Sequence, residues 1–124
     1  MTCHCDRLVV AFELPRRPVP KGRPRFGNGR AYTDARTVAY EDAVEKACRA
    51  AMTGPPVSGD VALWCLFEQR NAVAADTDNL VKACSDAIEG AAFVNDRQVV
   101  EVRARRVLRA DVDRVSVAVL AVAS

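Results

Sequence analysis

Apolar residues recur along the chain with two different periods, one typical of β-strands and one typical of α-helices. The strand pattern comes first in the sequence. Residues 7–14 (RLVVAFEL) are expected to form the first strand. Residues 60–69 (DVALWCLFEQ) are nearly all apolar and are bounded by Gly59 and Asn71. A short, continuous apolar run of this kind is typical of a strand covered on both faces, which would place Trp64 and Phe67 in the core.

Two further strands are expected near the end of the chain. Over residues 100–105 the apolar and charged positions alternate strictly, and residues 114–122 are again mostly apolar. The apolar positions of the alternating segment are Val100, Val102 and Ala104, and the charged positions are Glu101, Arg103 and Arg105. The alternation breaks at residues 105–106, and a β-bulge is one explanation for this break.

Between these strands the period changes to that of an α-helix in two places. One helix is expected over about residues 34–52, capped by Thr33 or Asp34, with the apolar stripe Tyr40, Ala43, Val44, Ala47, Cys48 and Ala51. The other is expected over about residues 78–90, with the stripe Leu80, Cys84, Ala87, Ile88 and Ala91.

The resulting order, β-α-β-α-β-β, predicts a small α/β (α+β) fold in which two helices pack on a mixed sheet of about four strands. The 124 residues fit a single domain, with residues 1–6 expected to form a flexible tail. No apolar run is long enough for a transmembrane helix, and the N-terminus lacks the pattern of a signal peptide, so we expect a cytoplasmic protein. The five cysteines are an odd number and are expected to be reduced.

The segment between the first strand and the first helix is strongly basic. Residues 15–33 contain four prolines (Pro15, Pro18, Pro20, Pro24) and three glycines (Gly22, Gly27, Gly29), which predict a long loop with a short hairpin turn at 27–29. Residues 16–36 carry seven basic residues against Asp34, a balance of +6 in a chain whose net charge is +2. Such a loop attracts phosphates, although a solvated, arginine-rich surface would have the same composition.

Residues 76–96 have the opposite balance, with five acidic residues against Lys82. If the chain is extended at Asp76 and Asp78, both carboxylates point the same way, and a helix N-terminus that favours anions follows directly. Asp96 comes after the helix and is expected to return to the same place. Three carboxylates with a lysine suit Mg²⁺ or Mn²⁺. The alternative is structural: Asp78 caps the helix, Asp78, Lys82 and Asp86 form ordinary i,i+4 pairs, and Asp96 lies in a turn.

Other chemistries have little support in the sequence. The only histidine is His4, in the expected tail, so a Ser-His or Cys-His nucleophile is not expected. The chain contains neither of the glycine-rich nucleotide-binding motifs, nor a Cys-x-x-Cys pair for zinc. Carboxylates suited to a metal, combined with a basic loop, point to phosphodiester chemistry.

Four sequence motifs together resemble those of RusA-type Holliday junction resolvases, small enzymes of phages and prophages. The motifs are P-V-P-K-G-R-P-R-F, A-Y-T-D, D-T-D-N-L-V-K-A-C-S-D-A-I-E-G and V-N-D-R-Q-V-V-E, and the resemblance covers about residues 12–107. It implies a bacterial or phage-encoded homodimer that binds four-way DNA junctions in recombination and repair. It further implies Mg²⁺-dependent, paired symmetric nicks that leave 5′-phosphate and 3′-hydroxyl ends.

The resemblance also implies roles for individual residues of the acidic segment. Asp76 and Asp78 match the family's D-x-D metal ligands, and Asp96 matches its third catalytic aspartate. Lys82 matches a lysine required for cleavage, which we expect near the scissile phosphate. Asp86 matches a recurrent helix aspartate with no assigned role.

In the basic loop, Lys21, Arg23 and Arg25 match the family's basic arm and, with Arg30, are expected to contact DNA phosphates. One departure concerns the pair Asn95-Asp96, where many members have two aspartates. We take Asp96 as the ligand. If the first position supplied the ligand instead, Asn95 would offer only a neutral oxygen, and the protein would be a junction-binding or regulatory module with impaired catalysis.

Overall fold

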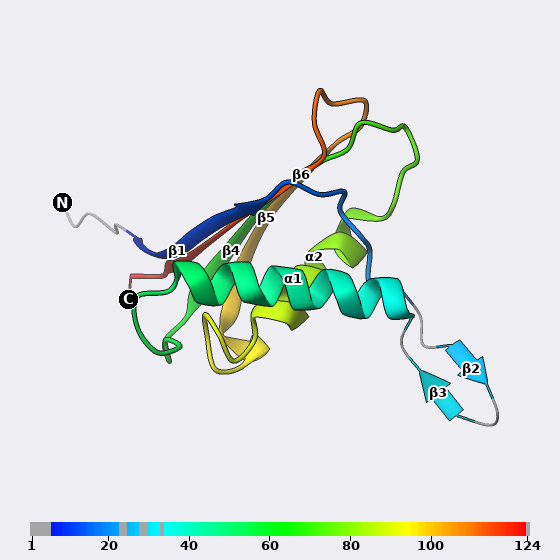
Figure 1. The fold of residues 1–124 in the computed structure, drawn as a ribbon. Coiled ribbons are helices and arrows are strands. Elements are labelled where there is room, and N and C mark those ends of the chain that lie inside the picture. Colours follow the sequence, from blue (N-terminus) through cyan, green and yellow to red (C-terminus); the bar gives the residue numbers. More distant parts are fainter. Residues whose placement is uncertain (1–5, 23–24, 28–29, 33, 124) are drawn as a thin grey trace.

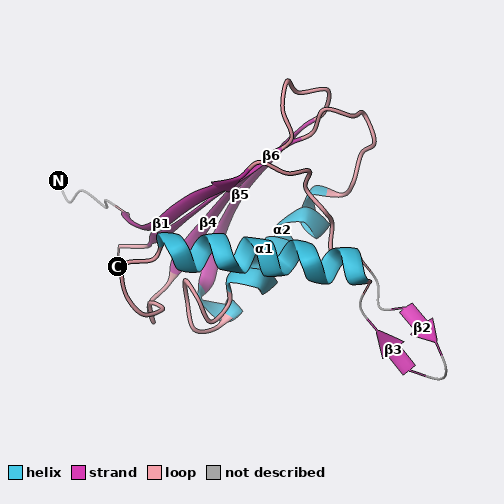
Figure 2. Ribbon diagram, viewed as in Figure 1, coloured by secondary structure: helices cyan, strands magenta, loops and turns pink. Residues whose placement is uncertain are grey.

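Two helices cover one face of a four-stranded sheet in the computed structural model, which describes residues 6–22, 25–27, 30–32 and 34–123 (Figures 1 and 2). The strands are β1 (Arg7–Leu14), β4 (Val61–Glu68), β5 (Val99–Val107) and β6 (Arg114–Ala121), in the order β1-β6-β4-β5. Strands β4 and β5 are parallel and the other pairs are antiparallel. With α1 (Ala35–Ala51) and α2 (Thr77–Ile88), this confirms the predicted α/β (α+β) class and element order.

The core lies between the sheet and the two helices. Successive residues of a strand point to opposite faces, and every second residue of β4 from Val61 to Phe67 is buried in the core cluster. Tyr40 of α1 and Leu80 of α2 belong to the same cluster and are fully buried, as the predicted apolar stripes require. The N-terminus of α1 is capped by Asp34, whose Oδ1 accepts a hydrogen bond from the backbone N–H of Arg36 at 2.8 Å.

The second face of β4 is not covered by any helix, so the prediction of a strand covered on both faces was wrong. Phe67 is fully buried, but Trp64 is only half-buried on the open face, and the guanidinium of Arg103 lies 4.9 Å from its ring centroid. A hollow of about 430 Å³ lies on this face, lined by residues that include Trp64, Leu66 and Ala118. The domain has only two layers, the sheet and the pair of helices. The helices therefore cover one face of the sheet and leave the other face open.

The basic segment contains a small hairpin of two strands, β2 (Arg25–Gly27) and β3 (Arg30–Tyr32). They pair antiparallel with Gly27 opposite Arg30, which confirms the predicted short hairpin. In Figure 1 this hairpin extends away from the body of the molecule, beyond the N-terminal end of α1.

The predicted bulge at residues 105–106 was wrong. Leu66 and Phe67 of β4 pair in regular register with Arg105 and Arg106. The irregularity lies instead at the start of the pair, between Val61 and Ala62. The two arginines interrupt the apolar alternation because β5 is an edge strand, where charged side chains are tolerated.

The ends of the described chain lie together. The backbone N–H of Ala123 donates a hydrogen bond to Asp6 Oδ1 at 3.3 Å, while the remainder of the predicted tail lies outside the described residues. Neither α1 nor α2, nor any other helix in the described ranges, is long and apolar enough to cross a membrane. Cys48, Cys65 and Cys84 are free and buried in the structure.

Candidate functional site

Asp76 is held at the start of α2 by a loop with its own hydrogen bonds. The buried Gln69, at the end of β4, donates from Nε2 to Asn71 Oδ1 at 2.8 Å and to the Val73 carbonyl at 2.9 Å. The guanidinium of Arg106 donates to the carbonyl of Ala75, the neighbour of Asp76. The loop is therefore fixed to the C-terminal ends of β4 and β5, and Asp76 is fixed with it.

Asp76 and Asp78 both lie exposed at the N-terminal end of α2. The Asp76 carbonyl accepts hydrogen bonds from the N–H groups of Asn79 and Leu80, both at 3.1 Å. Its side chain makes no capping hydrogen bond within the described chain, so the carboxylate is not used to start the helix. Asp78 lies in the first turn, where a negative charge is favoured by the helix dipole.

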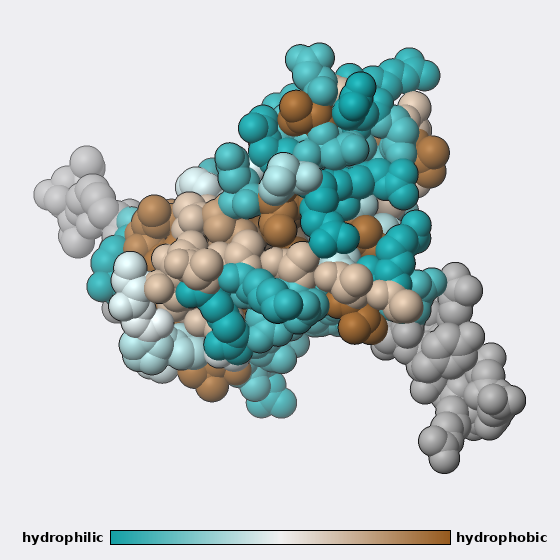
Figure 3. Space-filling view, in the orientation of Figure 1, coloured by the Kyte–Doolittle hydropathy of each residue, from teal (hydrophilic) through white to brown (hydrophobic). Residues whose placement is uncertain are grey.

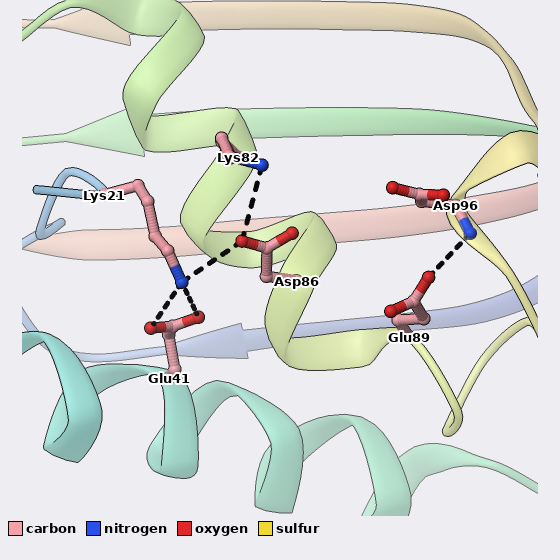
Figure 4. A network of polar contacts seen from close by, with 6 residues as sticks. All are labelled: Lys21, Glu41, Lys82, Asp86, Glu89 and Asp96. Atoms are coloured by element: carbon pink, nitrogen blue, oxygen red, sulfur yellow. Dashed lines mark hydrogen bonds and ion pairs between the residues drawn. The ribbon is translucent and has the colours of Figure 1, made fainter. Parts of the chain in front are cut away.

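Further along α2, Lys82 and Asp86 form a pair with an Nζ–Oδ2 distance of 3.6 Å (Figure 4). Lys82 is exposed, with 60 % of its side-chain surface accessible, so its ammonium can also reach an external anion. Asp86 is less exposed and has a second partner, Lys21. The predicted line of charges on α2 is therefore present for Lys82 and Asp86.

Lys21 joins the basic loop to both helices. Its ammonium donates to the two carboxylate oxygens of Glu41 at 3.0 and 3.2 Å and lies 3.1 Å from Asp86 Oδ2 (Figure 4). Its backbone N–H donates to the Asn79 carbonyl at 2.9 Å. Burial lowers the pKa of Lys21, but hydrogen bonds and charge attraction from both carboxylates outweigh it and raise the pKa above 10.5. The ammonium predicted to contact a DNA phosphate is thus engaged by two protein carboxylates; we name this arrangement the Lys21 clasp.

The Lys21 clasp leads to a stability prediction. Lys21→Met removes the cation that lies between Glu41 and Asp86 and leaves Asp86 with only its longer pair to Lys82, and we expect the free energy of unfolding to fall by about 1–2 kcal/mol. Because the folded pKa of Lys21 is raised, the stabilisation is present below pH 10.5 and is lost as the pH rises through that folded value. Urea denaturation followed by circular dichroism measures the loss.

The matched control for this prediction is Lys46→Met. Lys46 pairs with Asp42 at 2.9 Å, but 75 % of its side chain is exposed. We expect a loss below about 0.5 kcal/mol, as for other exposed helical ion pairs. Equal losses in the two variants would show that the clasp contributes no more than a surface pair.

Asp96 lies at the other end of α2, and the prediction that it returns to Asp76 was wrong. Its backbone N–H donates to Glu89 Oε2 at 2.8 Å, and Glu89 is the residue that caps the C-terminus of α2 (Figure 4). The 12 residues of α2 span about 17 Å. Asp76 follows the end of β4 and Asp96 precedes the start of β5. Because β4 and β5 are parallel, these two points are at opposite ends of the sheet.

The carboxylates of one chain therefore do not assemble the predicted three-aspartate metal site. Among the residues that the structure describes, no group of three His, Cys, Asp or Glu side chains is placed to hold a metal ion. Asp76 and Asp78 remain together at the start of α2, and Asp96 is separated from them. A site made of all three aspartates is incomplete within a single chain.

Asn95 has a local structural use. Its Oδ1 accepts a hydrogen bond from the N–H of Arg97 at 2.9 Å, and its own N–H donates to Gln98 Oε1 at 2.8 Å. This reciprocal capping box starts the short 3₁₀ helix Asp96–Gln98. Because the Asn95 amide oxygen is already used in this capping box, Asp96 and not Asn95 is favoured as the functional member of the pair.

A cationic groove of about 690 Å³ leads to Asp76. Its lining includes three basic residues, Arg17, Lys21 and Arg36, and polar groups of Gln69, Asn71 and Asn79. Hydrophilic side chains gather in Figure 3 on the side of the molecule where the loops 69–76 and 108–113 lie. Arg17 and Arg36 contributed to the charge balance of the basic segment, but no spacing in the sequence placed them beside Asp76.

The other predicted DNA contacts belong to the hairpin. Arg25 and Arg30 lie on β2 and β3, at the two ends of a pair that projects from the molecule (Figure 1). Arg23 lies outside the described residues. Contact of these arginines with DNA stays a prediction.

An α/β domain with a carboxylate pair at a helix N-terminus and a cationic groove beside it is suited to act on a phosphate ester. A family model described as Endodeoxyribonuclease RusA matches residues 15–120, and the chain therefore belongs to the RusA endodeoxyribonuclease family. No curated protein matches the chain with significant similarity. The matched range contains all the candidate site residues, so DNA is the substrate class and phosphodiester hydrolysis the reaction class.

Proposed function

We propose that this protein is a Mg²⁺-dependent endonuclease that resolves four-way DNA junctions. It cuts two strands by paired symmetric nicks, leaving 5′-phosphate and 3′-hydroxyl ends, in DNA recombination and repair in the bacterial cytoplasm. The observation that carries the proposal is membership of the RusA family over residues 15–120, with Asp76 and Asp78 exposed beside a cationic groove. The proposal includes Mn²⁺ as a substitute for Mg²⁺, because both ions prefer oxygen ligands.

The residues of the groove suit the binding of a DNA strand. The guanidinium groups of Arg17 and Arg36 can each hold a phosphate in a two-pronged contact. The exposed ammonium of Lys82 and the amide groups at the start of α2 favour a phosphate next to Asp76 and Asp78. Two carboxylates repel a phosphodiester, which is the physical reason for including a divalent cation in the proposal.

A homodimer fits the symmetry of the substrate. A four-way junction is cut on two strands related by a twofold axis, and a closed twofold dimer presents two identical sites. The proposal therefore includes a homodimer in which each protomer supplies one groove.

The test is a cleavage assay on a labelled four-way junction with Mg²⁺ and with EDTA. We expect paired nicks in opposing strands, ligatable and dependent on Mg²⁺. The separation of Asp96 from Asp76 within one chain favours a second candidate, a junction-binding module without catalysis. That candidate predicts tight, salt-sensitive junction binding without nicks in either Mg²⁺ or Mn²⁺, and this outcome would replace the nuclease proposal.

The groove leads to a binding prediction. Arg17→Ala and Arg36→Ala should each weaken binding to junction and duplex DNA alike, and each should reduce the slope of log K against log salt by about 1. Fluorescence anisotropy at several salt concentrations measures both quantities. The control is Arg49→Ala: Arg49 is exposed near the end of α1, paired with Glu45 at 2.8 Å and outside the groove. An unchanged slope in the Arg17 and Arg36 variants would exclude the groove from the DNA-binding surface.

A further inference from the structure

Arg106 occupies a position of β5 where the alternation of the strand predicts an apolar residue. It follows Val102 and Ala104 on the same side of the strand, and it pairs in register with Phe67, which is fully buried in the core. Its side chain therefore belongs to the face of the sheet that the helices cover, and it is half-buried there. A charged group in such a place requires a polar partner.

The partner of Arg106 is a backbone carbonyl. The guanidinium donates a hydrogen bond to the oxygen of Ala75, the residue directly before Asp76. Within the described chain no carboxylate pairs with this guanidinium, so its bond to the protein is made to the loop 69–76 alone. The charge at residue 106 thus serves to hold the segment that leads into α2.

The peptide groups on both sides of Asp76 are fixed. The Ala75 carbonyl and the Asp76 N–H lie in one planar peptide group, so the bond from Arg106 sets the plane from which the Asp76 side chain leaves the backbone. The next peptide group is held by the helix, because the Asp76 carbonyl accepts hydrogen bonds from the N–H groups of Asn79 and Leu80. The carboxylate itself makes no capping hydrogen bond within the described chain.

We propose that Arg106 is a positioning residue for Asp76: through the Ala75 carbonyl it fixes the direction of the carboxylate at the cationic groove. The inference rests on the proposed nuclease function. Arg106 acts on the backbone and does not touch DNA in this role. A displacement of about 1 Å at an active site can slow a reaction by about 10²-fold, so this one hydrogen bond affects the rate of cutting more than the stability of the fold.

Three variants of β5 test the proposal by single-turnover cutting of a four-way junction with Mg²⁺. Arg106→Met removes the donor and should slow cutting by about 10–100-fold. Arg106→Lys keeps one donor for the same carbonyl, and it should cut within a few-fold of the wild-type rate. Arg105→Met is the matched control, because it removes an equal charge from the next residue, which is exposed and pairs with Leu66 on the open face. It should cut at the wild-type rate.

Junction binding separates positioning from a direct contact with DNA. We expect the affinity of both Arg106 variants for the junction to equal that of the wild type. If Arg106→Met instead weakens binding and reduces the slope of log K against log salt by about 1, Arg106 contacts a phosphate and the positioning role is overturned. It is also overturned if Arg106→Met cuts within a few-fold of the wild-type rate, or if Arg106→Lys is as slow as Arg106→Met.

Amide hydrogen exchange tests the contact without reference to catalysis. The N–H groups of Asn79 and Leu80, which bind the Asp76 carbonyl, should exchange about 10-fold faster in Arg106→Met and near the wild-type rate in Arg106→Lys. Unchanged exchange in Arg106→Met would overturn the positioning role, whatever the protein cuts. If the wild-type protein does not cut the junction, the proposed nuclease function fails, whereas faster exchange in Arg106→Met would still show that Arg106 holds Asp76 in place.

Discussion

Replacing Asp78 with asparagine should abolish strand cutting by the protein while leaving its affinity for a four-way junction nearly unchanged. Asparagine keeps the size of the side chain and its place in the first turn of α2, but it removes the negative charge. Loss of a single preorganised charged group in an active site typically costs about 10²–10³-fold in rate. The measurement is a single-turnover cleavage assay with Mg²⁺, alongside a binding titration of the same junction.

Two comparisons separate catalysis from folding in this experiment. Asp78→Asn also removes an acidic residue from a helix N-terminus, which should cost only about 0.3–1 kcal/mol of stability. Asp42→Asn is the matched control, because Asp42 is an exposed helical aspartate paired with Lys46 at 2.9 Å, outside the groove. It should cut at the wild-type rate. Cutting by Asp78→Asn within a few-fold of that rate would remove Asp78 from the active site.

The elements of the fold were largely predictable from local patterns. The strand over residues 7–14 and the helix around residues 34–52 have clear periodic patterns of apolar residues. In the structure, both elements begin and end within two residues of the predicted bounds. Turn chemistry was equally informative in the hairpin, where Gly27 pairs with Arg30. These features depend on neighbouring residues, which is why a single sequence contains enough information to predict them.

The site was less predictable, because its parts meet only through the topology. The sequence places Asp96 after the helix, but whether it lies near Asp76 depends on β4 and β5 being parallel neighbours. The engagement of Lys21 by Glu41 and Asp86 likewise joins three segments whose spacing has no local signature. Composition correctly identified a basic loop, yet it could not distinguish an arginine that lines the groove from a lysine that ties the loop to the helices.

A pair of neighbouring substitutions in β4 should give very different losses of stability. Phe67 is fully buried between the sheet and the helices, and Phe67→Ala should lower the free energy of unfolding by about 3–5 kcal/mol. Leu66 is half-buried on the open face, and Leu66→Ala should cost about 1–2 kcal/mol, because part of its side chain is already exposed to water in the folded protein. Urea denaturation at several protein concentrations measures both losses.

The comparison also decides how β4 is covered in solution. The apolar sequence of β4 predicted burial on both faces, whereas the structure buries one. If Leu66→Ala costs as much as Phe67→Ala, and the loss grows with protein concentration, then a second copy covers the open face. A small loss that is independent of protein concentration shows instead that the second face of β4 stays open to solvent, as in the structure.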